Sequence, residues 1–301
     1  MDNPTEPVDM TGRVCIVTGA NSGIGRATAQ GLAARGAHVV MVCRDRKRGR
    51  DARDAIRDAT GNDAVDLTLA NLASQLEVRE LADRLLDTYD RIDVLVNNAG
   101  VYNDLRSLTV DYVETTFAVN YLSHFLLTNL LLDRLKRTAE RHGEARIVNV
   151  GSEAHRGGTI DFDDINAAED YGGLQAYAQS KLALLLFTYE LARRLRGTGV
   201  TVNCVHPGVV ATNIWSGNKD PLALAAQMFK WFYRSPERGA EGPLYLATSP
   251  EAADVTGAYF KDTEPVDSSD ASIDEATAQR LWNRSAEMVE LKEQETAAVK
   301  K

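Results

Sequence analysis

Hydrophobic positions follow two alternating patterns along most of this chain. Short runs rich in Val, Ile, Leu and Cys are each followed by a longer stretch in which apolar residues recur every three or four positions. The short runs predict strands that are buried on both faces, and the longer stretches predict helices. Strands and helices that alternate in this way indicate a parallel sheet, because parallel neighbours are joined by helical crossovers.

The predicted strands are Arg13–Thr18, His38–Cys43, Ala64–Leu69, Asp93–Asn97, Arg146–Val150, Thr201–His206 and Ala258–Phe260. The predicted helices are Gly23–Arg35, Lys47–Ala59, Ser74–Tyr89, Asp111–Arg137, Gly173–Arg196, Leu222–Tyr233, Pro236–Ala247 and Asp274–Ala298. Right-handed crossovers between such strands give an α/β fold with a doubly wound parallel sheet, the Rossmann arrangement, and helices on both faces.

The organisation of the chain indicates a single Rossmann-type domain over residues 1–301. No internal repeat and no linker rich in Gly, Pro or Ser divides it. We expect a core of about 11–262, a substrate lid of about 209–235 and a helical C-terminal extension of about 263–301.

Composition and charge narrow the class of protein. The content of 44% hydrophobic and 26% charged residues is ordinary for a soluble protein, and the net charge of −9 argues against nucleic-acid binding. The richest apolar run, Tyr121–Leu132, is shorter than the roughly 20 residues that span a bilayer. The polar segment Met1–Thr11 lacks the features of a secretory signal. We therefore expect a cytoplasmic protein.

The cysteines are Cys15, Cys43 and Cys204, each within an apolar run that is predicted to be a strand. An odd count in such positions favours buried free thiols in a reducing compartment. No Cys or His pairs fall at metal-ligand spacing, so no metal site is expected.

A glycine-rich turn, Thr18–Gly25, joins the first strand to the first helix. Glycine tolerates positive φ and lets a phosphate approach the backbone, and a helix N-terminus offers free N–H groups to that phosphate. Since this turn lies in the first βαβ unit, it predicts a dinucleotide site, with a merely tight strand–helix turn as the alternative. The predicted cofactor contacts here are Gly19, Asn21, Ser22, Gly23, Ile24 and Gly25.

Arg44 follows the second strand, where NAD-binding proteins place a carboxylate on the ribose. A guanidinium there suits the 2′-phosphate of NADP(H), and Arg46, Lys47 and Arg48 add positive charge. These charges could instead form a solvated helix face, and Asp45 could reach the ribose. NADP(H) is favoured and NAD(H) stays open.

Several motifs occur together and in order. They are the glycine turn Thr18–Gly25, Asn97-Asn98-Ala99-Gly100, the set Asn120, Ser152, Tyr177 and Lys181, and Pro207-Gly208 followed by Thr212. With these motifs the chain resembles the short-chain dehydrogenase/reductase family over residues 11–262. The resemblance implies that Asn120, Ser152, Tyr177 and Lys181 are catalytic. It also implies cofactor contacts at Asn71, Leu72, Asn98, Ala99, Gly100, Tyr177, Lys181, Pro207, Gly208 and Thr212.

Tyr177 and Lys181 are one helical turn apart, so both lie on one face of the predicted helix. An ammonium favours tyrosinate, and we expect it to lower the Tyr177 pKa from its ordinary value near 10. Tyr177 could then exchange a proton with a substrate oxygen that Ser152 polarises, while a nicotinamide carries the hydride. By resemblance, Asn120 holds a water that links Lys181 to solvent.

Three features of the sequence depart from the family pattern. Gly151 replaces the first of two serines, and Asn71-Leu72 replaces Asp-Leu at the adenine. Ser152 and Tyr177 are 25 positions apart (177 − 152), wider than usual, so we expect an added rim loop at Arg156–Gly172 that carries Asp161, Asp163 and Asp164.

The stretches RIVNVGSEAH, AYAQSKLALLLFTYELARRL and RLWNRS are similar to the retinol dehydrogenase and X-linked dehydrogenase/reductase branch. That branch implies a retinoid-, polyprenoid- or steroid-like substrate. The segment after Thr212 is apolar, with Trp215, Leu222, Leu224, Met228, Phe229, Trp231, Phe232 and Tyr233. It is interpreted as a hydrophobic lid, with core packing and membrane contact as alternatives.

The resemblance also implies a homo-oligomer that pairs through Asp111–Arg137 and Gly173–Arg196. Alternative functions are a catalytically silent redox sensor, a broad-specificity reductase of small carbonyls, and epimerisation or dehydration on the same scaffold. The complete Asn-Ser-Tyr-Lys set argues against the silent sensor.

Overall fold

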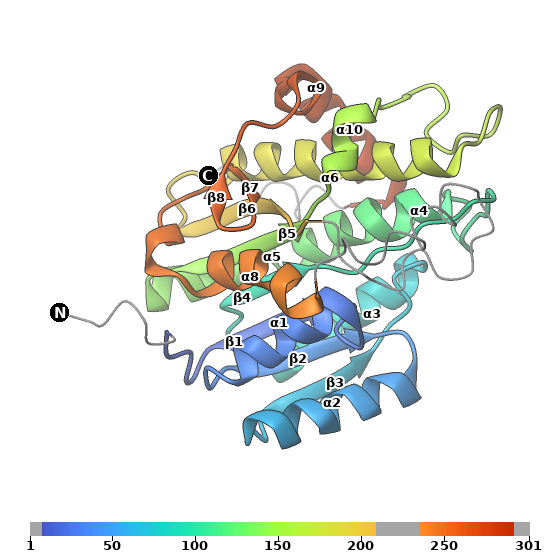
Figure 1. The fold of residues 1–301 in the computed structure, drawn as a ribbon. Coiled ribbons are helices and arrows are strands. Elements are labelled where there is room, and N and C mark those ends of the chain that lie inside the picture. The colour runs from blue at the N-terminus through green and yellow to red at the C-terminus, as the bar shows by residue number, and fades with distance from the viewer. Residues whose placement is uncertain (1–7, 209–234, 292–301) are drawn as a thin grey trace.

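Strand β1 (Val14–Thr18) lies inside an eight-stranded sheet of order β3-β2-β1-β4-β5-β6-β7-β8 (Figure 1). The computed structural model describes residues 8–208 and 235–291. Strands β1 to β7 are parallel, and β8 is antiparallel to β7. The other strands are β2 (His38–Cys43), β3 (Val65–Leu69), β4 (Val94–Asn97), β5 (Ala145–Val150), β6 (Val200–His206), β7 (Tyr259–Lys261) and β8 (Glu264–Pro265).

Helices pack on both faces of this sheet, so the predicted doubly wound α/β fold is confirmed. The longer ones are α1 (Gly23–Ala33), α2 (Arg46–Thr60), α3 (Gln75–Thr88), α5 (Ser123–His142), α6 (Gly173–Arg194), α8 (Pro236–Thr248) and α10 (Glu275–Met288). The shorter ones are α4 (Thr115–Phe117), the π-helix η1 (Ala118–Leu122), the 3₁₀ helices η2 (Glu153–Gly157) and η5 (Pro250–Ala252), and α9 (Asp270–Ile273).

Two hydrophobic layers hold the helices to the sheet. Alternate residues of β1 enter opposite layers, since Val14 and Ile16 belong to one and Cys15 and Val17 to the other. The first layer is formed with α3, α5 and α6, and the second with α1, α2 and α8. Figure 1 shows α1 and α8 side by side on their face of the sheet. All three cysteines are buried with free thiols, as predicted.

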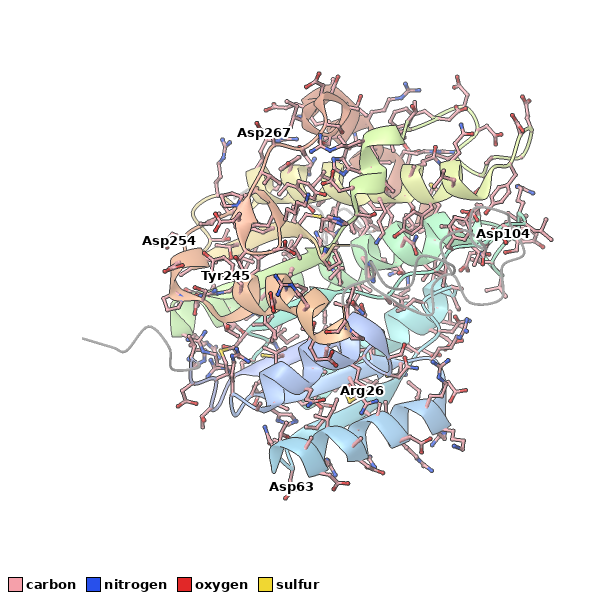
Figure 2. The ribbon with its side chains drawn as sticks, in the orientation of Figure 1. Arg26, Asp63, Asp104, Tyr245, Asp254 and Asp267 are labelled. Carbon is pink, nitrogen blue, oxygen red and sulfur yellow. The ribbon has the colours of Figure 1, made fainter. Side chains whose placement is uncertain are left out.

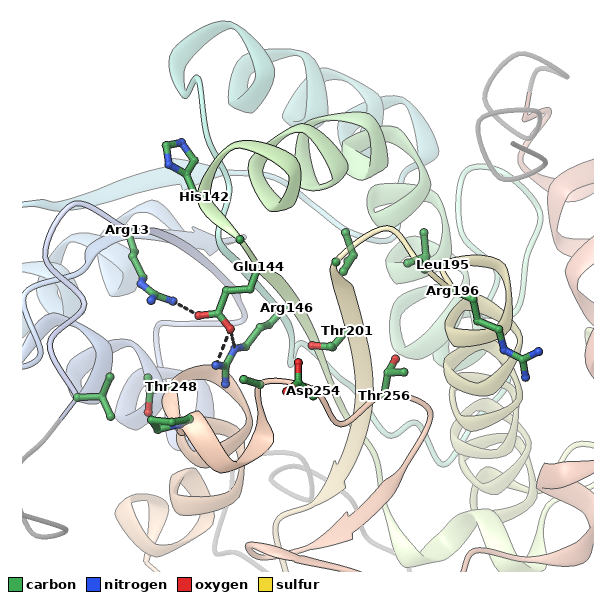
Figure 3. Close-up of a pocket in the computed structure, with 17 residues that line it drawn as sticks. Arg13, His142, Glu144, Arg146, Leu195, Arg196, Thr201, Thr248, Asp254 and Thr256 are labelled. Carbon is green, nitrogen blue, oxygen red and sulfur yellow. Dashed lines mark hydrogen bonds and ion pairs between the residues drawn. The ribbon is translucent and has the colours of Figure 1, made fainter. Parts of the chain in front are cut away.

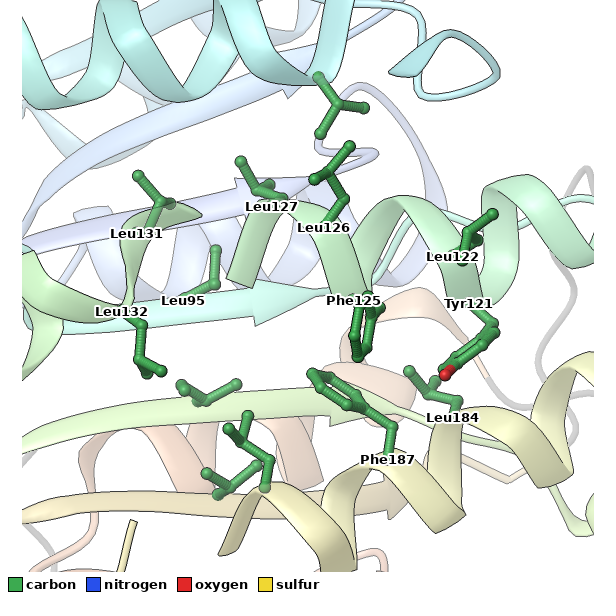
Figure 4. Close-up of a cluster of buried hydrophobic side chains, with 14 of the residues drawn as sticks. Leu95, Tyr121, Leu122, Phe125, Leu126, Leu127, Leu131, Leu132, Leu184 and Phe187 are labelled. Carbon is green, nitrogen blue, oxygen red and sulfur yellow. The ribbon is translucent and has the colours of Figure 1, made fainter. Parts of the chain in front are cut away.

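Aromatic side chains join α5 and α6 in the first layer (Figure 4). Phe125 and Phe187 meet edge to face with ring centroids 5.4 Å apart, and Tyr121 packs against both. Trp282 of α10 adds a ring 5.0 Å from that of Phe125, and the Arg194 guanidinium lies 4.1 Å from the Trp282 ring centroid. The described part of the C-terminal extension contains the helices α9 and α10, and α10 is part of the core. The predicted helix Asp274–Ala298 has the wrong end, because α10 ends at Met288 and Glu290 has a positive φ of 49°.

The predicted helix Asp111–Arg137 has wrong bounds. Residues 101–114 form an irregular segment with a bridge between Leu108 and Glu114, and the helix runs from Thr115 to His142 through α4, η1 and α5. The reason is local, because the Glu114 carboxylate accepts hydrogen bonds from the N–H groups of Thr116 and Phe117 and so begins the helix. The predicted helix Leu222–Tyr233 and the apolar lid residues lie outside the described ranges.

Candidate active site

The carboxyl ends of the parallel strands bring the predicted site residues to one edge of the sheet. The chain crosses from one side of β1 to the other between β3 and β4, and ligands of doubly wound sheets bind at this kind of switch point. The described residues that follow these strands include Gly19, Arg44, Asn71, Asn98, Ser152 and Pro207. Thr212, a predicted cofactor contact, lies outside the described residues.

The glycine turn after β1 is braced by the segment after β4. Gly19 and Gly23 have positive φ values of 67° and 53°, a conformation that side chains disfavour. The Asn98 side chain donates to the Thr18 carbonyl (2.7 Å), and the Thr18 hydroxyl accepts from the Asn98 and Ala99 N–H groups (2.9 and 3.0 Å). The two predicted cofactor motifs therefore form one structural unit.

The first turn of α1 is open to an anion. Its N-cap is Ser22, whose side chain makes no capping hydrogen bond within the described structure. By contrast, α2, α3 and α10 are each capped by a side chain, those of Asp45, Ser74 and Asp274. Free N–H groups at a helix start carry partial positive charge, so α1 and its glycines fit a pyrophosphate.

The side chains that follow β2 differ in how far they are engaged. Arg44 is exposed at the carboxyl end of β2. The carboxylate of Asp45 accepts the Arg48 N–H at 2.7 Å, so it caps α2 rather than reaching outward. After β3, Asn71 Oδ1 accepts a hydrogen bond from the Ala73 N–H (3.2 Å). The family resemblance places this residue at the adenine of the cofactor.

Asn120 lies in the π-helix η1 and is fully buried. Its Oδ1 accepts from the Val101 N–H (2.7 Å), and its Nδ2 donates to the Val101 carbonyl (3.0 Å) and to Ser180 Oγ (3.0 Å). The amide therefore ties the segment after β4 to α6, one residue before Lys181. π-Helical turns inside α-helices are frequent at functional sites.

Ser152, Tyr177 and Lys181 meet beside this turn. The Tyr177 and Ser152 side chains share a hydrogen bond. Lys181 Nζ lies 5.7 Å from the Tyr177 ring centroid and donates to the Val150 carbonyl at 2.9 Å. A Cβ built on Gly100 would lie 3.4 Å from Asn120 Oδ1 and 3.9 Å from Lys181 Nζ, so the glycine lies beside both of these predicted catalytic residues.

The expected pKa of Tyr177 was wrong in direction. Burial raises the pKa of this phenol, and the hydrogen bond with Ser152 only partly opposes it. The same burial lowers the pKa of Lys181 to about 8. Desolvation is the larger of the two effects on the Tyr177 pKa, so the tyrosine keeps its proton at neutral pH.

Sequence reasoning missed two side chains that support this cluster. His155 is buried in η2, three residues after Ser152, and its Nδ1 lies 2.7 Å from the Ser152 carbonyl oxygen. Tyr102 places its ring edge to face with Tyr177, with centroids 6.0 Å apart. The three-residue spacing of Ser152 and His155, which is that of one helical turn, could have indicated that His155 lies near Ser152. No local pattern in the sequence indicated the contact of Tyr102 with Tyr177.

A cavity of about 570 Å³ lies elsewhere, at the amino ends of the strands (Figure 3). Arg13, Glu144 and Arg146 line it, and Glu144 forms an ion pair with each of the two arginines. Figure 2 shows Asp254 of this cavity on the opposite side of the molecule from Asp104, in the segment after β4. This cavity is therefore separate from the Tyr177 cluster.

The described residues contain neither a membrane-spanning helix nor a metal-binding cluster. None of their helices is long and apolar enough to cross a membrane. Nor do His, Cys, Asp and Glu side chains gather in groups of three or more that could hold a metal ion in the described ranges.

Comparison with known proteins agrees with this geometry. The family model described as short chain dehydrogenase matches residues 13–222. Human retinol dehydrogenase 13 is 44% identical over 286 residues, which cover 93% of this chain and 85% of the relative. Mouse retinol dehydrogenase 14 is 44% identical over 298 residues, with coverages of 94% and 88%. The RhlG/NADP active-site complex of Pseudomonas aeruginosa superposes with a TM-score of 0.69 at 31% identity and covers 85% of this chain and 97% of that one.

Proposed function

This chain belongs to the short-chain dehydrogenase/reductase family, and we propose that it reduces and oxidises hydrophobic substrates with NADP(H). Membership makes it an oxidoreductase that acts on CH–OH and C=O groups. The proposal adds the cofactor, the substrate class and the role of each residue.

One observation carries the proposed chemistry, the hydrogen bond between the Tyr177 and Ser152 hydroxyls with Lys181 behind the ring. Because burial keeps the Tyr177 phenol protonated, this group is suited to donate a proton to the oxygen of a carbonyl. Ser152 would hydrogen-bond the same oxygen and polarise it. The Lys181 ammonium would stabilise the tyrosinate that remains.

Asn120 would act by holding these groups rather than by contacting substrate. Its amide joins Val101 to Ser180, and Ser180 precedes Lys181 on α6. The described contacts engage the side-chain amide, so the water that the family resemblance assigns to this residue would share the Asn120 main-chain carbonyl with His124 Nδ1, which lies 3.2 Å from it.

The residues present fit a nicotinamide dinucleotide. The uncapped start of α1 and the glycine turn would hold the pyrophosphate, and Arg44 would pair with a 2′-phosphate. When bound, the cofactor supplies or accepts the hydride. The RhlG complex is named for NADP, which supports the same choice here.

The substrate class follows from the relatives and from the rim of the site. The proteins that are 44% identical are named retinol dehydrogenases, and their substrates would be apolar alcohols and aldehydes. Exposed apolar side chains stand on the segment after β4 and at the start of α6, namely Leu105, Val110, Tyr112 and Leu174. Buried Tyr102 would form an aromatic wall beside Tyr177.

A panel of carbonyls tests the proposal. Initial rates are measured with retinal, a polyprenal, a steroid ketone and glyceraldehyde, each with NADPH and with NADH. We expect the apolar carbonyls to react and NADPH to be preferred. Turnover of glyceraldehyde alone would contradict the substrate class, and cofactor binding without any turnover would favour the sensor.

A further inference from the structure

His155 uses both ring nitrogens within the described structure. Its Nδ1 lies 2.7 Å from the Ser152 carbonyl oxygen, and its Nε2 lies 3.2 Å from the main-chain nitrogen of Ser269. The first partner can only accept a hydrogen bond and the second can only donate one. The ring is therefore neutral with its proton on Nδ1, and a proton on Nε2 would face the Ser269 N–H.

Two more contacts join the same turn to the C-terminal part of the chain. Tyr259 of β7 donates to a Glu153 carboxylate oxygen at 2.8 Å, and Arg156 donates to the Asp267 carbonyl at 2.6 Å. The His155 ring also packs edge to face on Tyr259, with centroids 4.9 Å apart. Figure 2 places Asp267 beside the segment that leads into α9.

These contacts surround a residue of the catalytic cluster. The Ser152 carbonyl accepts from both the His155 main-chain N–H (3.2 Å) and the ring, and Ser152 Oγ accepts from the Ala154 N–H at 3.2 Å. The backbone of Ser152 is thus fixed by the turn that His155 closes, and its hydroxyl is the partner of Tyr177.

We propose that His155 is a positioning residue, which as the Nδ1–H tautomer couples residues 264–273 of the C-terminal extension to Ser152. This proposal adds a positioning residue to the function proposed above. Those of its tests that measure activity rest on that proposed function. The extension would then set the position of the hydroxyl that polarises the substrate oxygen.

The surroundings of His155 favour the neutral ring. Burial lowers its pKa, and the charged neighbours on its own turn, Glu153 and Arg156, pair with each other at 2.9 Å. From β7 the ring faces Tyr259, whose phenol burial keeps protonated. On the connection that leads into α9, Asp267 accepts from Arg156 through its main-chain carbonyl. Acidification that protonates Nε2 would break the bond to Ser269.

A double-mutant cycle tests whether His155 acts through Ser152. His155→Phe keeps an aromatic ring against Tyr259 and removes both hydrogen bonds. We expect kcat to fall about tenfold with the KM for NADPH changed less than about twofold, and no further fall when His155→Phe is added to Ser152→Ala. Equal losses in both backgrounds would overturn the proposal, because a merely structural role is additive.

The link to the extension is tested separately with proline. Ser269→Pro removes the one N–H that His155 accepts, and the φ of −79° at Ser269 suits proline. Asp270→Pro, at the first position of α9, is the matched control, since proline is tolerated there. We expect Ser269→Pro to lose about tenfold in kcat and Asp270→Pro to keep it. Equal activity of the two variants would contradict the coupling.

The tautomer is measured without turnover. The chain has five histidines, so ¹⁵N-labelled imidazole signals can be assigned by comparison with His155→Asn. We expect the neutral His155 ring to carry its proton on Nδ1. A neutral ring with its proton on Nε2 would overturn the proposal even if no carbonyl were turned over. Failure of the substrate panel alone would instead count against the proposed function.

Discussion

Asn98 occupies the space that a side chain at Gly25 would need. A Cβ on Gly25 would lie 2.3 Å from Asn98 Nδ2 and 2.5 Å from the Gly19 carbonyl oxygen. Two motifs that are 73 residues apart (98 − 25) in the sequence are therefore fitted to each other, and the glycine turn keeps its shape because a neighbouring strand end supports it.

Gly25→Ala should damage both the fold and the cofactor site. The added methyl group must displace backbone, which costs about 1–3 kcal/mol in the free energy of unfolding. We expect that loss in urea unfolding, and at least a tenfold weaker Kd for NADPH in a fluorescence titration. Gly157→Ala is the control, because a Cβ there meets nothing within 4 Å. Wild-type affinity in Gly25→Ala would show that the turn has no part in cofactor binding.

Arg44→Ser should lower the preference for NADPH. A guanidinium paired with a phosphate contributes about 1.5–3 kcal/mol, so we expect the KM for NADPH to rise at least tenfold while that for NADH changes little. Arg50→Ser removes an exposed charge from α2, the helix that follows Arg44, and serves as the control. If both variants raise the KM for NADPH and the KM for NADH to the same extent, Arg44 contributes only to the overall positive charge and does not bind the 2′-phosphate.

Lys181 should make stability depend on pH. Burial lowers its pKa to about 8, whereas its ordinary value is 10.5. Between these values the unfolded chain binds more protons, so the free energy of unfolding rises with pH. Relative to Lys181→Met, the wild type should gain about 2 kcal/mol between pH 7 and 9.5 in urea unfolding without cofactor. A difference that is constant with pH would contradict a buried, titrating Lys181.

Trp282→Ala should lower the stability of the fold. The side chain is 2% exposed and packs between Phe125 and Phe187, so its loss should cost about 3–5 kcal/mol. Trp282→Phe retains an aromatic ring and should lose less. Thermal unfolding measures the difference. Wild-type stability in Trp282→Ala would mean that α10 is not part of the core. The surface of α5 and α6 that α10 covers would then be free for the expected homo-oligomer.

Most of the sheet could be predicted from sequence, and so could the edge of the sheet at which the candidate catalytic residues lie. Buried strands such as Val14–Thr18 have a strong local signal, and parallel strands bring their carboxyl ends together whatever the loops do. Tyr177 and Lys181 share a face because helical spacing alone ensures it.

The rest depended on tertiary contacts. The start of the helix at Thr115 is set by the Glu114 carboxylate, and η1 is a π-turn that no periodicity distinguishes from α-helix. The direction of the Tyr177 pKa depends on burial, which a spacing rule omits. The bond from Ser269 to His155 joins residues 114 positions apart, so only the folded chain shows it.

The most direct test compares the wild type with Tyr177→Phe in NADPH-dependent reduction of retinal, with NADPH affinity measured in parallel. The phenyl ring keeps the packing against Tyr102 and removes only the hydroxyl that would donate the proton. We predict a loss of about 10²–10⁴-fold in kcat with the Kd for NADPH within about twofold of the wild type. Equal rates in the two proteins would contradict the account.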